Sequence, residues 1–404
     1  MESDLPKKSN KLIFIYTIIC GVCGICFFFF WLLYWRYIEY TNDAYVQGNQ
    51  VYITPLHPGF LTSIHTDDTF LVTQGQLLVE LDETDAKIGL NRANENLANA
   101  VRNVCQMMHE VFAYRSDIEV KKAEYIKTAQ DYEHRENVID AGGVSTEDFE
   151  HAIAALRASF FSLQMTEILY DKALASVQNT SIADHPTVKS AADAVRDAWV
   201  RLYRCKIYSP VDGLCAQRTI QVGMYVEAGT PLMSIIPLDQ IWVNANYKET
   251  QMKRMRIGQK VKLTVDLYGD DVVYDGKIVG LPGGAGNAFS LLPPQNLSGN
   301  WIKIVQRLPV RVAIDPDQIK KHPLRIGLST EARTHTRDAS GHLVPDNGKG
   351  SPLYITPIFK KEETGDEKLI EKIVLDNIDP MLMQFYKTPL TPPSIDAHEI
   401  KVFQ

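Results

Sequence analysis

The chain has 404 residues, 45% of them hydrophobic and 23% charged, and it carries a formal net charge of −7 at pH 7. These proportions are ordinary for folded protein, and the length leaves room for two or three domains. The acidic balance, together with the lack of a basic cluster interleaved with aromatic residues, argues against nucleic acid as a partner.

The N-terminal part of the sequence predicts a membrane anchor over residues 12–35. Residues 1–11 are polar and basic, whereas residues 12–35 carry no charge and exceed the ~20 residues that a bilayer-spanning helix needs. Aromatic residues crowd the far end of this stretch, where an interfacial belt belongs. Because lysines precede it and only Arg36 directly follows it, the positive-inside rule leaves residues 1–11 in the cytoplasm. A cleavable signal peptide is the alternative, but bulky residues stand where small cleavage-site residues are needed.

The six cysteines do not form a disulfide framework. Three of them lie inside the apolar stretch with C-x-x-C-x-x-C spacing, and we interpret them as small thiols of an apolar helix rather than iron–sulfur or zinc ligands. The other three are scattered, although Cys205 and Cys215 could pair if the strands that carry them adjoin.

Two stretches of short strand-like runs separated by turns flank a long helical insertion. Residues 51–82 alternate apolar runs with Pro/Gly turns, and residues 204–237 repeat the pattern after the insertion. Pro58-Gly59-Phe60-Leu61 and Val211-Asp212-Gly213-Leu214 occupy equivalent places in the two stretches. The sequence therefore predicts one small β-domain that is split into two halves, and these halves resemble a lipoyl-like domain.

Residues 83–203 predict an α-helical coiled-coil hairpin. Apolar or aromatic residues recur every seven positions from Leu90 to Ile139, and again from Phe149 to Val177. A seven-residue period keeps one narrow seam on one side of each helix. An arm of about 57 residues spans roughly 85 Å, too long for ordinary core helices of a globular domain, which are the alternative.

The tip of this hairpin is predicted near residues 140–146. Gly142 and Gly143 can close the first helix, because glycine tolerates the left-handed conformation found just past a helix end. The hydroxyl residues Ser145 and Thr146, followed by acidic residues, form a start signal for the second helix. Further along, Pro186 falls inside an irregular step of the heptad pattern, which predicts a kink or break in the return arm.

Residues 238–335 are mostly strand-patterned, and a small antiparallel β-barrel fits them. The connector at residues 36–50 is expected to contribute to the barrel, and two further strands are expected around Pro309. Residues 336–404 form a C-terminal tail with a short amphipathic helix near 367–377, and the final residues have the composition of an unstructured extension. The whole sequence predicts an α+β fold: a transmembrane helix, the split β-domain with its inserted hairpin, and the barrel.

This layout resembles that of HlyD-like membrane fusion proteins, the periplasmic adaptors of tripartite pumps, and most closely their EmrA-type multidrug efflux branch. The resemblance covers roughly residues 12–335 and takes in the short helix near Leu369. It is carried by Asp43-Ala44-Tyr45-Val46-x-Gly48-Asn49, Ser209-Pro210-x-Asp212-Gly213, Phe289-Ser290-Leu291-Leu292-Pro293, the run from Gly299 to Val312, and Pro323 to Ser329. Within the Gly299–Val312 run, the residues that we take as the family signature of the barrel are Asn300, Trp301, Gln306, Arg307 and Pro309.

The resemblance implies a bridging function in the periplasm. The chain would be a single-pass protein of the inner membrane, and its barrel would dock on a transporter of the major facilitator class. The hairpin tip would meet a TolC-like outer-membrane channel, and several copies would assemble, because one hairpin cannot line a conduit.

The resemblance also implies which tip residues would contact the channel. Related adaptors carry Arg at the tip, then Leu four residues on and Ser eleven residues on. Here these places hold Arg135, Ile139 and Thr146, with Gly142 and Gly143 in the turn between them. The simpler interpretation makes Arg135 a solvated charge near a helix end and Thr146 a helix cap.

Other classes of function remain as alternatives. No catalytic constellation stands out, and the Gly-rich segment 280–286 lacks the Lys-Ser/Thr ending of a phosphate-binding loop. A type I protein-secretion adaptor, working with an ABC transporter, is the nearest alternative, and a purely structural tethered coiled coil is another. A lipoyl or biotinyl carrier needs an exposed lysine in the tight turn between its halves. Lys87 is the nearest lysine, but it falls in the helical insertion, so no covalent cofactor is expected.

Overall fold

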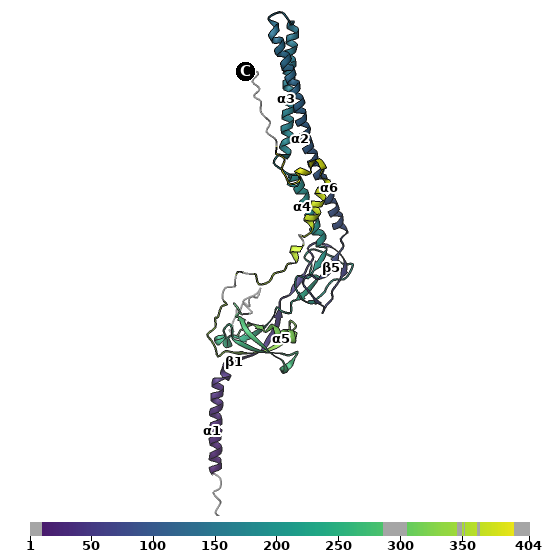
Figure 1. Cartoon of the computed structure of the whole chain (residues 1–404). Coiled ribbons are helices and arrows are strands. Elements are labelled where there is room, and N and C mark those ends of the chain that lie inside the picture. The colour runs from purple at the N-terminus through teal and green to yellow at the C-terminus, as the bar shows by residue number, and fades with distance from the viewer. Residues whose placement is uncertain (1–9, 286–304, 346–349, 351, 362–363, 392–404) are drawn as a thin grey trace, which may run out of the picture.

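The computed structural model of the chain describes residues 10–285, 305–345, 350, 352–361 and 364–391. The molecule is elongated, with the N-terminal helix at one end and the tip of a helical hairpin at the other (Figure 1). A β-barrel follows the N-terminal helix, and a smaller β-domain lies between the barrel and the root of the hairpin. The apolar core is accordingly divided into three clusters, one in the barrel, one in the smaller β-domain and one along the hairpin.

The N-terminal helix α1, Asn10–Leu33, runs into a short 3-10 turn η1, Trp35–Tyr37. Within the described part of the chain, the stretch Phe14–Tyr37 is the one helical segment long and apolar enough to cross a membrane. None of it is buried against the rest of the protein, which suits a helix whose apolar surface is covered by lipid.

Six antiparallel strands close the barrel in the order β1-β10-β13-β12-β11-β14. They are β1 Ile38–Gly48, β10 Ile241–Lys248, β11 Lys260–Val265, β12 Val273–Gly280, β13 Arg307–Ile314 and β14 Ser329–His335. The connector after α1 thus supplies β1, and closure leaves no unpaired sheet edge. Short helical turns join some of these strands: η2 Glu249–Arg254, η3 Gly269–Asp271 and α5 Pro316–Lys321.

One strand, β13, runs through Pro309, where the sequence predicted two. Pro309 is in register with Asn246 of β10, whereas the pairing of β13 with β12 reaches only Arg311. Proline lacks an N–H and is tolerated where a strand has a neighbour on one side. The expectation of a strand break at Pro309 was therefore wrong, while residues 301–304, where the first of the two expected strands would begin, lie outside the described residues.

The smaller β-domain contains two sheets, with orders β2-β9-β7-β4 and β6-β5-β3-β8. Its strands are β2 Val51–Ile53, β3 Gly59–Ile64, β4 Leu71–Val72, β5 Leu77–Leu81, β6 Lys206–Tyr208, β7 Gly213–Ala216, β8 Tyr225–Val226 and β9 Met233–Ile236. Each sheet takes strands from both sides of the hairpin, so the two halves share one core. Cys205 and Cys215 are both buried in this core as free thiols.

The hairpin consists of α2 Thr84–Ile139, α3 Thr146–Val177 and α4 Pro186–Tyr203. The heptad positions Leu90, Leu97, Val104, Val111 and Ile118 of α2 are all buried, as the seven-residue period predicts. The break expected in the return arm is confirmed, because eight residues, 178–185, separate the end of α3 from Pro186, which begins α4. Proline suits this first helical position, where its missing N–H would have no partner within the helix.

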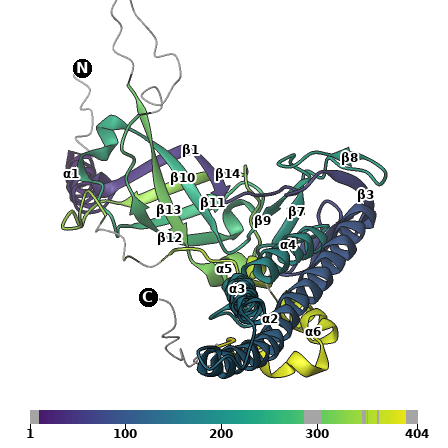
Figure 2. The ribbon, with the colours of Figure 1, turned by 90° about the horizontal axis from the view of Figure 1, so that it is seen from above.

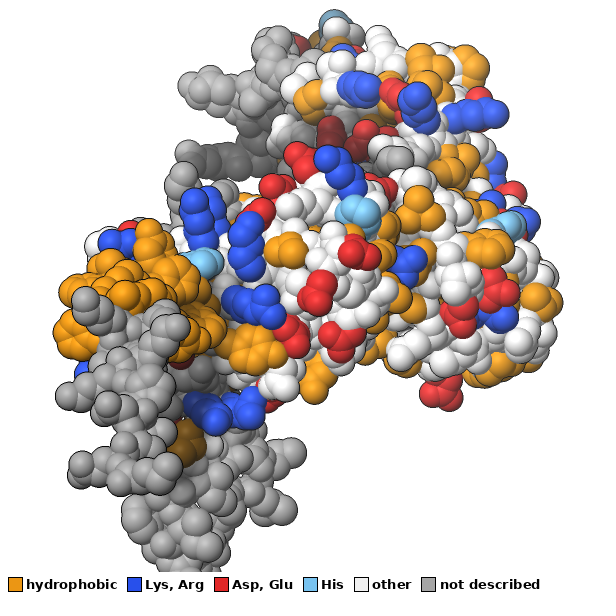
Figure 3. All heavy atoms as spheres, turned by 90° about the horizontal axis from the view of Figure 1, so that it is seen from below, with side chains coloured by type: hydrophobic (Ala, Val, Ile, Leu, Met, Phe, Trp, Pro, Cys, Tyr) orange, Lys and Arg blue, Asp and Glu red, His pale blue; other side chains and the backbone are white. Residues whose placement is uncertain are grey.

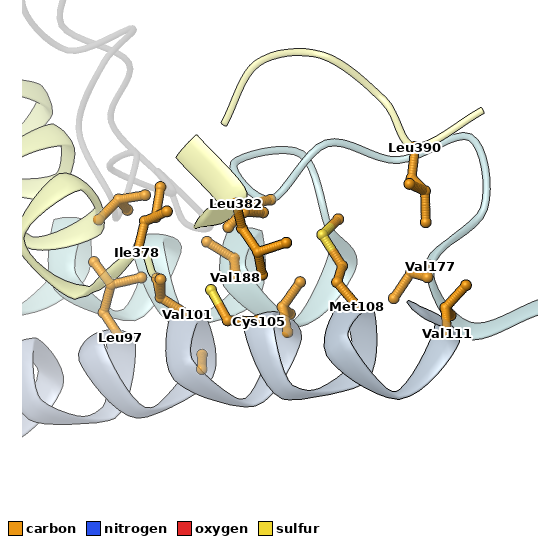
Figure 4. Close-up of a cluster of buried hydrophobic side chains, with 14 of the residues drawn as sticks. Leu97, Val101, Cys105, Met108, Val111, Val177, Val188, Ile378, Leu382 and Leu390 are labelled. Carbon is orange, nitrogen blue, oxygen red and sulfur yellow. The ribbon is translucent and has the colours of Figure 1, made fainter. Parts of the chain in front are cut away.

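The C-terminal segment differs from the predicted extension. After a short turn η5, Ile358–Lys361, the chain forms α6 Asp366–Asn377 and η6 Pro380–Phe385. Figure 2 shows α6 beside α2, and we call residues 366–391 the C-terminal strap. Leu382 and Leu390 are 2% and 5% exposed and belong to the core of the hairpin (Figure 4). The helix expected near residues 367–377 is confirmed by α6. The expectation of an unstructured extension was wrong for residues 378–391, whose buried side chains are unevenly spaced, and residues 392–404 lie outside the described residues.

Candidate functional site

The turn at the hairpin tip is closed by its two glycines. The N–H of Gly142 donates to the carbonyl of Ile139 at 3.0 Å, and the N–H of Gly143 donates to the carbonyl of Val138 at 3.1 Å. This pair of bonds is the Schellman arrangement, which needs a left-handed residue just past the helix end. Gly142 supplies that residue with φ +77°, so a glycine is required there for conformational reasons.

Ser145 caps the start of α3. Its hydroxyl accepts a hydrogen bond from the backbone N–H of Asp148 at 3.1 Å and donates to the Asp148 carboxylate at 2.6 Å. This cap satisfies one of the amides that the first turn of a helix leaves free. Thr146 is exposed in the first turn of α3, so the interpretation of Thr146 as the cap was wrong.

Arg135 ties the two arms together at the tip. Its guanidinium donates to the backbone carbonyl of Asp148 at 2.9 Å and lies 3.3 Å from the carboxylate of Asp131. One turn earlier, the rings of Tyr132 and Phe149 stack with their centroids 5.6 Å apart. Arg135 is therefore more than a solvated charge, although its side chain is still 35% exposed.

All five tip residues named from the sequence lie in the last turns of α2, the first turn of α3 or the turn between them, and this turn is at the far end of the molecule (Figure 1). Gly142, Gly143 and Thr146 are exposed, and Arg135 and Ile139 are half-buried. The tip therefore offers a guanidinium, an aliphatic side chain, a hydroxyl and bare backbone on a closed turn. Such a mixture suits contact with another protein. A contact between these residues and an outer-membrane channel stays a prediction.

The structure describes three of the five signature residues of the barrel. Asn300 and Trp301 lie outside the described residues. The carbonyl of Gln306 accepts a hydrogen bond from the N–H of Glu249 at 3.0 Å, which joins β13 to η2. Arg307 and Pro309 lie on β13.

Arg307 pairs with an acidic residue that the sequence analysis did not single out as its partner. Its guanidinium lies 2.8 Å from the carboxylate of Asp43 on β1. The other oxygen of Asp43 accepts a hydrogen bond from the side chain of Asn246 on β10 at 3.0 Å. Two motifs that carry the resemblance, one near Asp43 and one near Arg307, thus meet at one place on the barrel. An acidic residue inside a strand-like run is the signal that could have pointed to such a pair, because a partly buried charge needs a partner.

The root of the hairpin is held by Glu83. Its carboxylate lies 2.8 Å from the ammonium of Lys87 and 3.4 Å from that of Lys206 on β6. The hydrogen bond from Lys87, which has the largest effect, and the one from Lys206 lower the pKa of the Glu83 carboxyl group. Lys87, the lysine considered for a carrier protein, therefore lies in the first turns of α2 and pairs with Glu83.

The described residues include no group of three or more His, Cys, Asp or Glu side chains placed to hold a metal ion. Charged side chains join neighbouring segments at three places: Arg135 bonds the backbone of α3 at the tip, Arg307 pairs with Asp43 on the barrel, and Lys206 pairs with Glu83 at the hairpin root.

The comparisons with known proteins agree with this architecture. Residues 84–205 match the family model described as the EMRA alpha-helical hairpin domain. The chain is 40% identical over 348 residues to the multidrug export protein EmrA of Escherichia coli (strain K12), covering 85% of this chain and 89% of that protein. It is 42% identical over 340 residues to the probable multidrug resistance protein EmrK of the same strain, covering 83% and 88%.

Among solved structures, that of the periplasmic adaptor protein EmrA matches at 16% identity, with a TM-score of 0.38, over 74% of this chain and 99% of that chain. The resemblance inferred from the sequence motifs is confirmed by the close relatives. Because identity of this level extends over most of both chains, the protein belongs to the EmrA family of multidrug export proteins.

Proposed function

We propose that the chain is a membrane-anchored periplasmic adaptor of a multidrug efflux pump. It joins an inner-membrane transporter of the major facilitator class to a TolC-like channel in the outer membrane. The observation that carries this proposal is the axial layout, with a membrane-spanning segment at one end and a closed helical tip at the other (Figure 1). The 56 residues of α2 alone span about 84 Å, a length that suits a spacer between two membranes.

In this proposal the adaptor performs no chemistry on the exported compound. It holds the transporter and the channel in line, and its copies surround the path between them. A single hairpin is a narrow rod with one buried seam and cannot enclose a path. Several copies related by closed rotational symmetry can do so. The relatives' names support the export of drugs, and the single apolar helix supports an anchor in the inner membrane with the bulk of the chain in the periplasm.

The tip contact can be tested without disturbing the fold of the tip. Thr146 is exposed and Ser145 already provides the cap, so Thr146→Glu leaves the helix start intact and adds a charge that the helix N-terminus tolerates. The matched control is Thr187→Glu, because Thr187 is also an exposed threonine in the first turn of a helix, far from the tip.

We expect Thr146→Glu to reduce both drug resistance and recovery of the outer-membrane channel in pull-downs, while Thr187→Glu behaves as wild type. Arg135→Asp is expected to weaken channel coupling as well, but it also removes the bond to Asp148. Unchanged export by Thr146→Glu at native expression would overturn the tip contact.

The class of transporter is tested by co-purification from native membranes. We expect a major facilitator protein, identified by mass spectrometry, to be recovered with the adaptor. Recovery of an ATPase subunit in its place would refute this choice and favour an adaptor of type I protein secretion.

A further inference from the structure

The end of the barrel nearest α1 is basic, although the chain as a whole has a net charge of −7. Between residues 248 and 260 there are five Lys or Arg residues and a single acidic residue, Glu249. Arg36 precedes β1 and Arg337 follows β14 at the same end, where the acidic residues are Glu39 and Asp338 besides Glu249. We call this surface the basic rim, and its members are Arg36, Lys248, Lys253, Arg254, Arg256, Lys260 and Arg337.

Strand register places these residues at one end of the barrel. Ile38, the first residue of β1, pairs with His335, the last residue of β14. β10 runs antiparallel to β1 and leaves the barrel at this end, so η2 lies there as well. β11 enters beside it, because Val261 pairs with Thr334. The basic rim is therefore the face from which α1 leaves the barrel, and Figure 3 shows Lys and Arg side chains close to the apolar α1.

The aromatic residues at the end of α1 fix the height of the rim relative to a bilayer. Tyr34 and Trp35 are 59% and 57% exposed, and exposed aromatic rings at the end of a spanning helix lie at the level of the lipid headgroups. The guanidinium of Arg254 lies over the ring of Tyr37, 4.7 Å from its centroid. With α1 in a bilayer, as the proposed function places it, the basic rim lies at headgroup height.

The charges of the basic rim are available to an outside partner. Five of its members, Arg36, Lys248, Lys253, Lys260 and Arg337, are exposed. The ion pairs found among the described residues involve other cations of the chain and none of the rim. A group of exposed cations beside a spanning helix attracts anionic lipid, and the attraction weakens with salt.

We propose that the basic rim binds the phosphate-bearing headgroups of anionic phospholipids in the leaflet where α1 emerges. The lipid contact would hold the barrel upright on the bilayer and so set the direction in which the hairpin projects. This inference rests on the part of the proposed function that places α1 in a membrane. A lipid is favoured over an acidic protein surface, because the rim surrounds the helix that itself lies in lipid.

The test uses the full chain in nanodiscs without any transporter, made of phosphatidylcholine alone or of phosphatidylcholine with phosphatidylglycerol. Hydrogen exchange of residues 249–254 is measured by mass spectrometry in both. We expect a several-fold slowing of exchange when phosphatidylglycerol is present, and loss of this slowing at high salt. The double variant Lys248→Glu/Lys253→Glu should lose it too. The matched control is Lys320→Glu/Lys321→Glu, on the exposed helix α5 near the other end of the barrel, and it should retain the slowing.

Equal exchange in the two kinds of nanodisc would overturn the inference. Slowing that occurs only after the transporter is added would also overturn it, because the rim would then contact protein and not lipid. Removal of the chain from the nanodiscs by an alkaline wash would show that α1 is not embedded, and the anchor of the proposed function would fail with it. Loss of drug resistance in the tip variants is independent of all these results, so the two proposals can fail separately.

Discussion

The backbone N–H of Ile182 donates a hydrogen bond to the carbonyl of Phe385, 3.0 Å away, and so joins the break in the return arm to the C-terminal strap. The neighbouring N–H of Ala183 donates to the carbonyl of Tyr386 at 3.1 Å. Residues between α3 and α4 have left the helix, so their backbone groups need partners elsewhere. The strap provides these partners and covers the apolar side chains that the break would expose (Figure 4).

We expect Leu382→Ala to destabilise this joint by about 2–5 kcal/mol, the usual range for removing a buried leucine side chain. Leu382 is 2% exposed and packs in the core of the hairpin. Hydrogen exchange of residues 178–185 should accelerate, because the strap that holds their amides opens more often. The matched control is Met381→Ala, since the neighbouring Met381 is 78% exposed. Equal exchange in the two variants would show that the strap does not stabilise the break.

The seam of the hairpin gives a second prediction. Leu97 is fully buried in α2, and Leu97→Asp both removes its packing and places an unpaired charge among apolar side chains. We expect the helical melting transition, followed by circular dichroism, to shift to lower temperature. Val120→Asp on the same helix is the control, because Val120 is 63% exposed. An unaltered melting profile for Leu97→Asp would contradict a packed seam.

The parts of the structure that could be predicted are those with a sustained period. The seam could be inferred because its seven-residue spacing continues over many turns from Leu90 onward, so that many apolar residues indicate the same buried side of the helix. Helix α6 of the strap could be inferred from its amphipathic pattern. The rest of the strap could not, because Ile378, Leu382 and Leu390 are unevenly spaced and lie outside any long helix. The partner of Arg307 could not be inferred either. Asp43 is 264 positions away, and their meeting depends on the register of a closed barrel.

The lowered pKa of Glu83 predicts how the stability of the protein depends on pH. Its pKa is lowered in the folded protein from the ordinary value of 4.5, chiefly by the hydrogen bond from Lys87. A carboxylate with a lowered folded-state pKa contributes stability that is fully present above its unfolded pKa and is lost as the pH falls through the folded value. Glu83→Gln should therefore be less stable than wild type at neutral pH, and the difference should shrink below pH 4.5.

The measurement is the midpoint of urea unfolding for both proteins at neutral pH and in acid. The control is Glu95→Gln, which removes an exposed carboxylate from the same helix. A difference between Glu83→Gln and wild type that stays constant with pH would contradict a lowered pKa of Glu83 in the folded protein.

Replacing Arg307 tests whether this signature residue stabilises the barrel or contacts the transporter. The side chains of Arg307 and Asp43 are 44% and 30% exposed, and exposed ion pairs contribute only about 0–1 kcal/mol. Arg307→Gln should therefore leave the unfolding midpoint almost unchanged. If the residue contacts the transporter, recovery of the transporter and drug resistance should fall together. The matched control is Arg333→Gln, because Arg333 is similarly exposed on β14 of the same barrel and pairs with Glu331. Large destabilisation by Arg307→Gln would make its pairing with Asp43 a structural requirement, and normal export would exclude it from docking.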